Sequence, residues 1–468
     1  MDLALVIVID LIAIITVAVL ANSRDGLERA LPFVAFLMAL VPIESLLPLG
    51  FFSLTTHRIL IGLLAVFYLA RRKGMPSIPR ASLPFKGLIA VHALWSLVAT
   101  ANSIVPEMSI KKLLSVLLEY YLLYFLMYKC ITKVETIHRI LLGIVLGLIV
   151  CCTWGSFEAY NGWDILDYFP SVGHHWGALT GAGEQDREVR AHSTYDHAIL
   201  YGAALAMSIT LTLYLLTIVR KKSQRVLLWV GLLLMFLNIY KTSSRGPWLD
   251  AMLGCLLLLL FGKGQVRRTV LYIAMLSVSV LIIRPGVWAT IAGIYDNTFD
   301  GDTATASSYA YRFALQHAAV DRLKLYPSSH ALWGYGPESF YNVHLEGMLL
   351  GKHHVFLSCD NAWVEFLIET GFIGLVIVIL LLAQPMWTAL RGSRRGPPAA
   401  RELNFLLFVN FVMFYFQMYS VGMYSWGQNG YLLWILIAVT MAHARLHARR
   451  RTATPIALPE LQVEPVYA

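Results

Sequence analysis

The chain has 468 residues, of which 58% are hydrophobic and 14% charged, and its formal net charge is +9. Soluble globular proteins have about 25% charged residues, so this composition excludes an ordinary soluble domain. Long apolar runs recur from end to end, and as helices they can cross about 30 Å of hydrocarbon. We therefore predict an all-α, polytopic integral membrane protein, whose positive charge belongs to cytoplasmic loops and not to a nucleic-acid site.

Thirteen apolar segments are the predicted membrane spans, and one re-entrant segment among the first three would make them twelve. The first run begins with Asp2 and lacks a cleavage pattern, so we interpret it as a retained span and not as a signal peptide. The five cysteines have no metal-ligand spacing, so we predict no metal site. The approximate spans are 3–21, 30–46, 56–70, 85–100, 112–129, 139–159, 199–219, 226–240, 247–262, 269–284, 361–387, 404–421 and 430–444.

Six short basic connections, such as "RKKSQR" and "RGSRRGPPAAR", fall on one side of the membrane, which the positive-inside rule places in the cytoplasm. The other side receives two long loops. Loops longer than about 12–15 residues are usually functional or disordered, so we expect the site on this outer side. The predicted organisation is N-terminal helices (1–159), a periplasmic loop (160–198), central helices (199–284), a large periplasmic loop (285–360), C-terminal helices (361–445) and a cytoplasmic tail (446–468).

The turn "SSRGPWLD" places Arg245 at the start of a predicted membrane helix. A helix begins with positive partial charge, so a cation there is misplaced unless an anion joins it. The alternative is an arginine that snorkels toward water, with Ser243 or Ser244 as the helix cap. Snorkelling suits the carboxyl end of a helix better, which favours the anion.

Two further outer segments carry charge close to predicted spans. The segment "REVRAHSTYDHAILYG" offers Arg190 and His197 immediately before the seventh span. In the large loop, Arg312 opens an amphipathic stretch that the glycine turn "GYGPESF" closes. Alone, the first segment is equally consistent with an interfacial belt in which Asp196 compensates an arginine, and Arg312 with a surface salt bridge.

The segment "SCDNAWVEFLIETGFIGL" enters the next span with several polar residues. Asp360 could be the helix N-cap, while Asn361, Glu365 and Glu369 share a helix face at spacings of four. Glutamates in the first turns of a membrane helix are costly and usually have a partner or a function, and arginines on the same side are the expected partners. Several aromatic residues could stack on sugars or anchor the interface: Trp163, Trp176, Trp333, Tyr335 and Tyr341.

Arginine forks match phosphate oxygens, and a lipid-linked phosphate or diphosphate is an anion that can reach a membrane-embedded site. The motifs resemble those of the O-antigen ligase/polymerase superfamily of bacterial cell-surface polysaccharide enzymes. The resemblance covers about residues 185–376 in motif detail and the whole chain in topology. The matching features are Arg190 before a mid-chain span, the turn "SRG" at Ser244–Gly246, Arg312 followed by Pro327 and "GYG", and "DNAWVEFLIETGFIG" at the next span.

The resemblance implies a GT-C-like membrane fold and glycosyl transfer at the periplasmic face of the bacterial inner membrane. The donor would be an undecaprenyl-diphosphate-linked glycan and the acceptor a glycan or lipid A-core, with inversion at the anomeric carbon. No nucleotide sugar, cofactor or obligatory metal is implied. Membrane lipids and polysaccharide export or chain-length proteins are the other expected partners.

We accordingly predict Asp360 and Glu365 as catalytic residues, and a set of five residues that bind the diphosphate or the substrate. Lipid A-core ligases of the superfamily have a histidine where this chain has Asp360, so a polymerase of exopolysaccharide or O-antigen repeats is favoured. A ligase, and then a protein glycosylase, are the alternatives within the superfamily. The five binding residues are Arg190, His197, Arg245, Arg312 and Asn361.

A transporter or flippase is the alternative outside enzymes. Charged or titratable residues inside predicted spans could mark a translocation path: Asp10, Glu44, His92 and Glu119. Transporters favour repeated halves, whereas the two halves of this chain are not alike and its polar residues concentrate in loops on one side.

Overall fold

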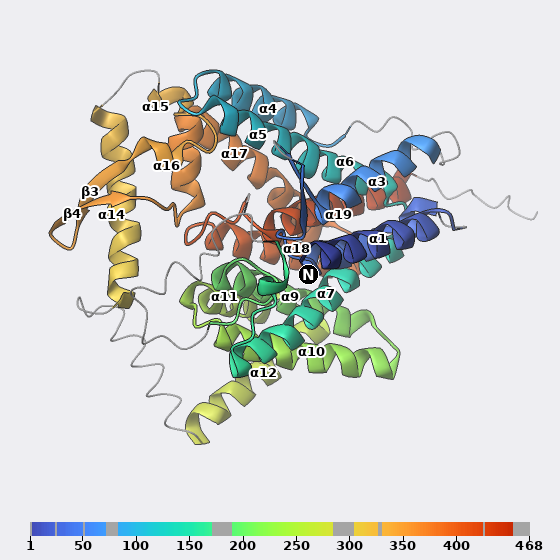
Figure 1. The fold of residues 1–468 in the computed structure, drawn as a ribbon. Helices are drawn as coiled ribbons and strands as arrows, with labels where there is room; N and C mark the ends of the chain where they lie inside the picture. The colour runs from blue at the N-terminus through green and yellow to red at the C-terminus, as the bar shows by residue number, and fades with distance from the viewer. Residues whose placement is uncertain are drawn as a thin grey trace, which may run out of the picture.

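The computed structural model describes residues 2–23, 26–49, 52–71, 83–170, 190–283, 304–325, 330–424 and 426–452. Within these residues, seven helical stretches are long and apolar enough to cross a membrane, which confirms the predicted all-α polytopic fold. They lie side by side as a bundle (Figure 1). The seven are α1 (Asp2–Ala21), the stretch Pro106–Cys130, α7 (Val134–Asn161), α9 (Ala198–Ile218), α10 (Lys222–Lys241), α17 (Ala362–Arg395) and α19 (Gln428–Thr452).

Shorter or less apolar helices account for the remaining predicted spans. The second predicted span, 30–46, was too long, because its helix ends at Leu40 and a hairpin of two strands follows. Val41 is extended, since the following Pro42 disfavours helical backbone at the residue before it. These helices are α2 (Leu31–Leu40), α3 (Thr56–Arg71), α4 (Lys86–Ala101), α11 (Arg245–Phe261), α12 (Gly264–Ile283) and α18 (Pro398–Gln417); the antiparallel strands are β1 (Leu46–Leu49) and β2 (Phe52–Thr55).

Hydrogen bonds join the loops at each of the two ends of the helix bundle. At one end, Glu28 accepts from the backbone of Thr132 and Lys133, and Arg445 donates to the carbonyl of Ile131. At the other end, Gln428 donates to the carbonyls of Val41 and Thr194. Helix α9 is the central helix, because nearly all of its side chains are buried.

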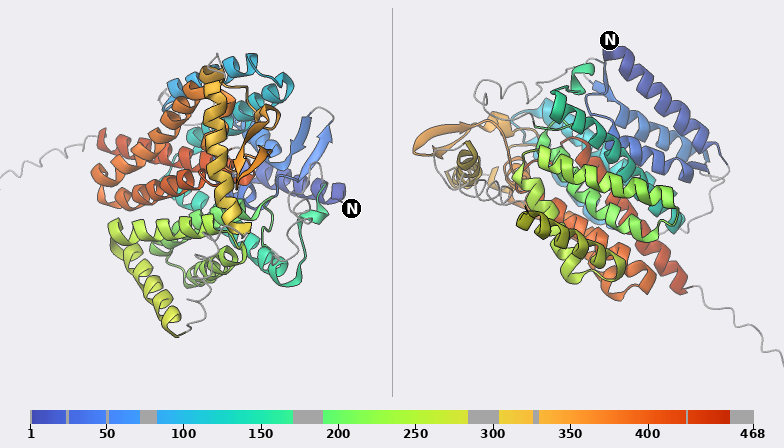
Figure 2. Two further views of the ribbon diagram at one scale, coloured as in Figure 1. Left: turned by 90° about the vertical axis from the view of Figure 1, so that its left-hand side faces the viewer. Right: turned by 90° about the horizontal axis from the view of Figure 1, so that it is seen from below.

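The described part of the large loop forms a layer at one end of the bundle (Figure 2). Helix α14 stands beside a two-stranded hairpin, which the sequence did not predict. Leu315, Phe340, Leu345 and Phe356 form the core of this layer. Its elements are α14 (Ala304–Leu325), α15 (His330–Trp333), α16 (Phe340–Val343), β3 (Leu345–Leu349) and β4 (Lys352–Phe356); the short elements elsewhere are η1 (Gly26–Arg29) and η3 (Leu166–Tyr168).

Helix α17 is broken at Gly371, whose φ of 69° and ψ of −177° are not helical. The glycine turn of the large loop packs into this break. Tyr335 N–H donates to the carbonyl of Ile368 at 2.9 Å, and Gly336 N–H donates to that of Glu369 at 2.9 Å. Carbonyls that the break removes from the helix ladder are thus satisfied by another segment, as buried backbone in a membrane protein requires.

We predict that Gly371→Ala lowers the stability of the folded protein by more than about 1–3 kcal/mol, the usual cost of strained backbone. A Cβ at Gly371 would lie 2.2 Å from the carbonyl oxygen of Leu332, in addition to the strain of the positive φ. Gly351 is the matched control, because its φ is +77° and a Cβ there would have no atom within 4 Å. Thermal unfolding of the purified variants measures both effects, and equal midpoints would contradict the clash.

Candidate functional site

Arg190 binds directly to the turn between α10 and α11. Its Nε donates to the carbonyl of Thr242 at 3.1 Å, and its Nη2 donates to the hydroxyl of Ser244 at 2.6 Å. The next residue repeats the contact, because Ala191 N–H donates to the carbonyl of Lys241 at 3.1 Å. The first outer segment and the "SSRG" turn therefore meet, which places Arg190 beside the first turn of α11.

Helix α11 begins at Arg245, which is partly buried, with Ser244 as its N-cap residue. The Ser244 side chain does not cap the helix. Its hydroxyl instead accepts from Arg190 and donates to the carbonyl of Thr242 at 3.0 Å. The start of α11 thus combines backbone N–H groups without a side-chain cap, a positive helix end and two guanidinium groups, an arrangement suited to an anion.

His197 is the N-cap of α9, and its Nδ1 accepts the N–H of Ile199 at 3.1 Å. Burial lowers the pKa of His197 to about 3, and the charges of Arg190, His192 and Arg312 lower it further. The ring is therefore neutral, and with Nδ1 as acceptor its Nε2 carries the hydrogen. His197 can donate a hydrogen bond to an anion but is too weak a base to take a proton.

The connection between α18 and α19, residues 418–427, touches both the first outer segment and the large loop. Trp426 Nε1 donates to Asp196 Oδ2 at 2.9 Å. Ser420 supplies a carbonyl to Arg312 Nη2 at 3.4 Å, and a Cβ at Gly422 would lie 2.7 Å from Glu365 Oε2. No sequence motif had marked this connection, yet it joins the parts of the site.

Arg312 and Asp360 face each other across the large loop, with Arg312 Nη2 at 3.7 Å from Asp360 Oδ2. The Asp360 side chain is 40% exposed, so a substrate hydroxyl can reach it. Burial of the rest of the group raises the pKa of Asp360 above its ordinary value, while Arg312 and a hydrogen bond with Ser358 hold this pKa down. Asp360 is thus a carboxylate with one cationic neighbour and an open side.

The helix cap of α17 is Asn361 and not Asp360, so that alternative for Asp360 was wrong. Asn361 Oδ1 accepts from the backbone N–H of Trp363 at 2.9 Å and of Val364 at 3.3 Å. Because Oδ1 is used by the helix, the Nδ2 group is what Asn361 can offer to a substrate. The carboxylate of Asp360 is correspondingly not engaged in capping.

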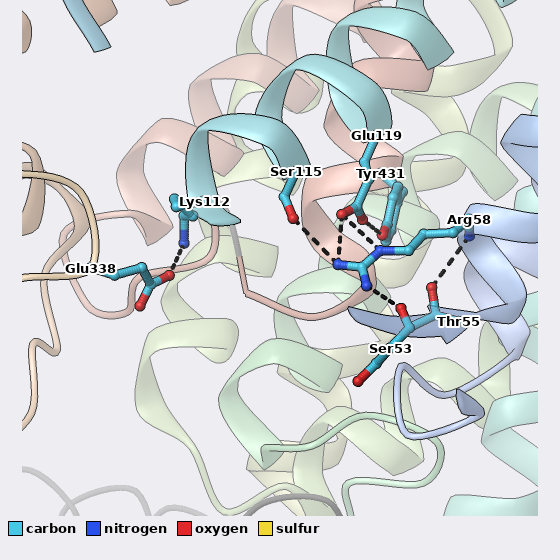
Figure 3. Close-up of polar contacts among 8 residues, drawn as sticks. All are labelled: Ser53, Thr55, Arg58, Lys112, Ser115, Glu119, Glu338 and Tyr431. Carbon is cyan, nitrogen blue, oxygen red and sulfur yellow. Dashed lines mark hydrogen bonds and ion pairs between the residues drawn. The ribbon is translucent and has the colours of Figure 1, made fainter. Parts of the chain in front are cut away.

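Lys112, which was not among the predicted site residues, approaches the two glutamates of α17. Lys112 Nζ lies 2.5 Å from Glu338 Oε1, in the turn that follows "GYG" (Figure 3). Its positive charge also acts on Glu365 and Glu369. The expected arginine partners of these glutamates are thus replaced by Lys112. The available signal was its position at the start of the predicted span 112–129, on the helical stretch that also carries Glu119.

Lys112 belongs to a helix that changes its winding, α5 (Pro106–Ser115) followed by the π-helix η2 (Val116–Tyr121) and α6 (Leu122–Cys130). Glu119 in the π-helix pairs with Arg58 at 2.9 Å and accepts from Tyr431 (Figure 3). π-Helical turns often occur at functional sites because they re-aim side chains. Here the turn directs Glu119 toward Arg58, which is a structural pairing.

Three of the four residues that could have marked a transport path have structural partners. Asp10 accepts from the Thr56 hydroxyl at 2.7 Å, and His92 Nδ1 lies 2.6 Å from the hydroxyl of Tyr121. Glu119 pairs with Arg58, as described above, and Glu44 lies within electrostatic range of Asp196 near the candidate site.

Glu158, Asp164 and His192 form the group in the described residues whose ligand atoms are close enough to hold a metal ion, all within 4.8 Å. His192 Nε2 lies 3.0 Å from Glu158 and 3.4 Å from Asp164. Burial lowers the pKa of His192, but Asp164 and Glu158 outweigh it and raise this pKa to about 9. The imidazolium therefore competes with any metal for the two carboxylates at neutral pH.

Two of the aromatic residues expected to stack on sugars are exposed, Trp163 at 46% and Tyr341 at 47%. Tyr335 of the glycine turn is 6% exposed and stacks on His330 of α15, so its role there is packing. Trp176 and Pro327 lie outside the described residues.

A family model described as O-antigen ligase matches residues 230–379, and no curated protein matches the chain. The matched segment begins in α10 and ends in α17. It contains Arg245, Arg312, Asp360 and Glu365, whereas Arg190, which binds the "SSRG" turn, precedes it. The match covers less than half of the chain, and together with the motifs and their order it supports the predicted resemblance to the O-antigen ligase/polymerase superfamily.

Proposed function

We propose that the protein is an inverting glycosyltransferase at the periplasmic face of the bacterial inner membrane. It transfers glycan from undecaprenyl diphosphate to an acceptor hydroxyl and polymerises exopolysaccharide or O-antigen repeat units. The observation that carries this proposal is the bond from Arg190 to Ser244, which gathers two arginines at the uncapped start of α11. The membrane-spanning bundle supports a lipid-linked anion as the ligand.

The leaving group of this reaction is the lipid diphosphate, and the negative charge that develops on it must be stabilised. When the acceptor oxygen bonds to the anomeric carbon, the bond from that carbon to the diphosphate oxygen breaks and the electron pair goes to the diphosphate. Arg190 and Arg245, the N–H groups of α11 and the neutral Nε2–H of His197 are the groups that would hold this charge. Arg312 contributes from the other side of the α18–α19 connection.

The acceptor hydroxyl needs a base, and Asp360 is the best placed carboxylate. It is open to substrate and its carboxylate is free from helix capping. Proton transfer to a carboxylate requires a geometry within hydrogen-bond reach and a pKa suited to the reaction. Glu365, held near Lys112 and Gly422, is the second carboxylate that can contact the acceptor.

Polymerase activity is favoured over ligase activity because Asp360 stands where lipid A-core ligases have a histidine. Purified protein with lipid-linked glycan should release undecaprenyl diphosphate only when acceptor is present, whereas a flippase would release none.

The glycans that accumulate in a deletion strain distinguish a polymerase from a ligase. Single repeat units indicate a polymerase, and long unattached chains indicate a ligase.

Arg190→Ala and Arg245→Ala should each lower glycan transfer by about 10²–10³-fold, the usual loss when one stabilising donor is removed from a developing charge. Protein levels in the membrane should stay normal. Arg268→Ala is the control, since Arg268 is exposed in the first turns of α12, away from the site. Transfer rates of the purified variants measure the effect, and full activity of Arg190→Ala would remove this residue from the site.

Asp360 must be ionised to act as a base, so the rate should fall as the pH drops through its pKa. Arg312 lowers this pKa, so Arg312→Gln should move the acid limb of the pH–rate profile to higher pH, whatever its effect on the maximum rate. Asp360→Asn should nearly abolish transfer. An acid limb that stays in place in Arg312→Gln would show that a different group is the base.

A further inference from the structure

Gln417, the last residue of α18, is a buried amide whose polar atoms lack partners. The residue is 1% exposed, and neither Nε2 nor Oε1 has a hydrogen-bond partner within the described residues. A buried polar group without a partner costs about 1–3 kcal/mol. An amide maintained at this cost is a candidate for binding a ligand.

The amide points at the start of α11. A Cβ placed on Gly246, the second residue of that helix, would lie 2.9 Å from Gln417 Nε2 and 3.3 Å from Oε1. The Ser420 hydroxyl would lie 3.1 Å from the same position. The glycine of the "SRG" turn is therefore the residue that lets Gln417 approach the backbone N–H groups at the amino end of the helix.

A second buried polar side chain lies on the same face of α11. Asp250 is 0% exposed, and both of its carboxyl oxygens lack partners within the described residues. It is four residues after Gly246, and Gly254, four residues further, packs against Met413 of α18. The seam between α11 and α18 is therefore polar directly beneath the turn that carries Arg245.

We propose that Gln417 is a donor-binding residue whose amide hydrogen-bonds a diphosphate oxygen at the amino end of α11. This inference rests on the proposed function and adds to it an uncharged side chain that donates hydrogen bonds to the diphosphate. A neutral amide binds a phosphate oxygen without adding to the repulsion among Arg190, Arg245 and Arg312. Its N–H groups complement the uncapped helix end, which alone would not define a site.

The test replaces Gln417 by leucine, which has similar shape and no polar atoms. If Gln417 only packs, Gln417→Leu should be neutral or stabilising, because replacing an unpaired polar group by an apolar one removes its desolvation cost. If Gln417 binds the donor, Kd should rise by about tenfold or more, since a hydrogen bond to a charged group contributes about 1.5–3 kcal/mol and 1.4 kcal/mol corresponds to tenfold. The thermal midpoint without lipid should not fall.

Binding is measured on the purified full-length protein in lipid nanodiscs with undecaprenyl diphosphate, undecaprenyl phosphate and inorganic pyrophosphate. Weakened binding of the diphosphate lipid together with inorganic pyrophosphate places the contact on the shared diphosphate, and weakened binding of the lipid alone places it on the lipid-linked form; both support the proposal. Ser208→Ala is the control, because Ser208 is also buried with an unpartnered hydroxyl but lies in the middle of α9. It should bind as the wild type does.

An unchanged Kd in Gln417→Leu overturns the proposal, whether the thermal midpoint stays the same or falls. Should Gln417→Leu fail to accumulate, Gly246→Ala gives the answer, because its methyl group displaces the amide; wild-type affinity there overturns the proposal as well. Arg245→Ala separates this inference from the proposed function. Loss of binding in Arg245→Ala with wild-type binding in Gln417→Leu refutes only the role of Gln417.

Discussion

The contact between Arg190 and the "SSRG" turn is the interaction on which the candidate site depends. A guanidinium that binds both the carbonyl of Thr242 and the hydroxyl of Ser244 ties the segment before α9 to the start of α11. The same bond occupies the serine that would otherwise cap the helix. One side chain thus brings positive charge to the helix end and keeps its N–H groups available, and both effects favour an anion there.

The second part of the site is built differently, where the large loop packs against the bundle. The glycine turn enters the break of α17 at Gly371, and Glu338 at the end of that turn pairs with Lys112. Asp360 and Arg312 lie on the loop side of this assembly. The α18–α19 connection joins the two parts, since Ser420 contacts Arg312 while Trp426 contacts Asp196.

The membrane fold could be predicted because apolar helix length and the placement of basic connections follow directly from the bilayer. The meeting of Arg190 with the "SSRG" turn followed from topology, which put both on one side. The partners across the bundle could not be predicted. Lys112 and Gln417 lie in or at the end of apolar helices, and only the packing of α5 and α18 against other elements brings them to the site.

The helix cap of α17 and the end of α2 could not be predicted from the sequence either. The sequence "CDNAW" allows either Asp360 or Asn361 to cap α17, and the choice of Asn361 depends on how the chain enters the helix. The short second helix and its hairpin follow from Pro42, whose effect on Val41 is local, although an apolar run of that length resembles a full span.

The broken helix α17 has an evolutionary consequence. Its first half, which carries Glu365, is bound by the glycine turn of the large loop, whereas Arg190 contacts the turn that leads into α11 and Arg245. If Glu365 contacts the acceptor while Arg190 and Arg245 hold the diphosphate, as proposed, these groups are attached to separate parts of the chain. On that proposal, substitutions in the large loop would change which glycan is extended and would leave in place the arginines that hold the carrier lipid.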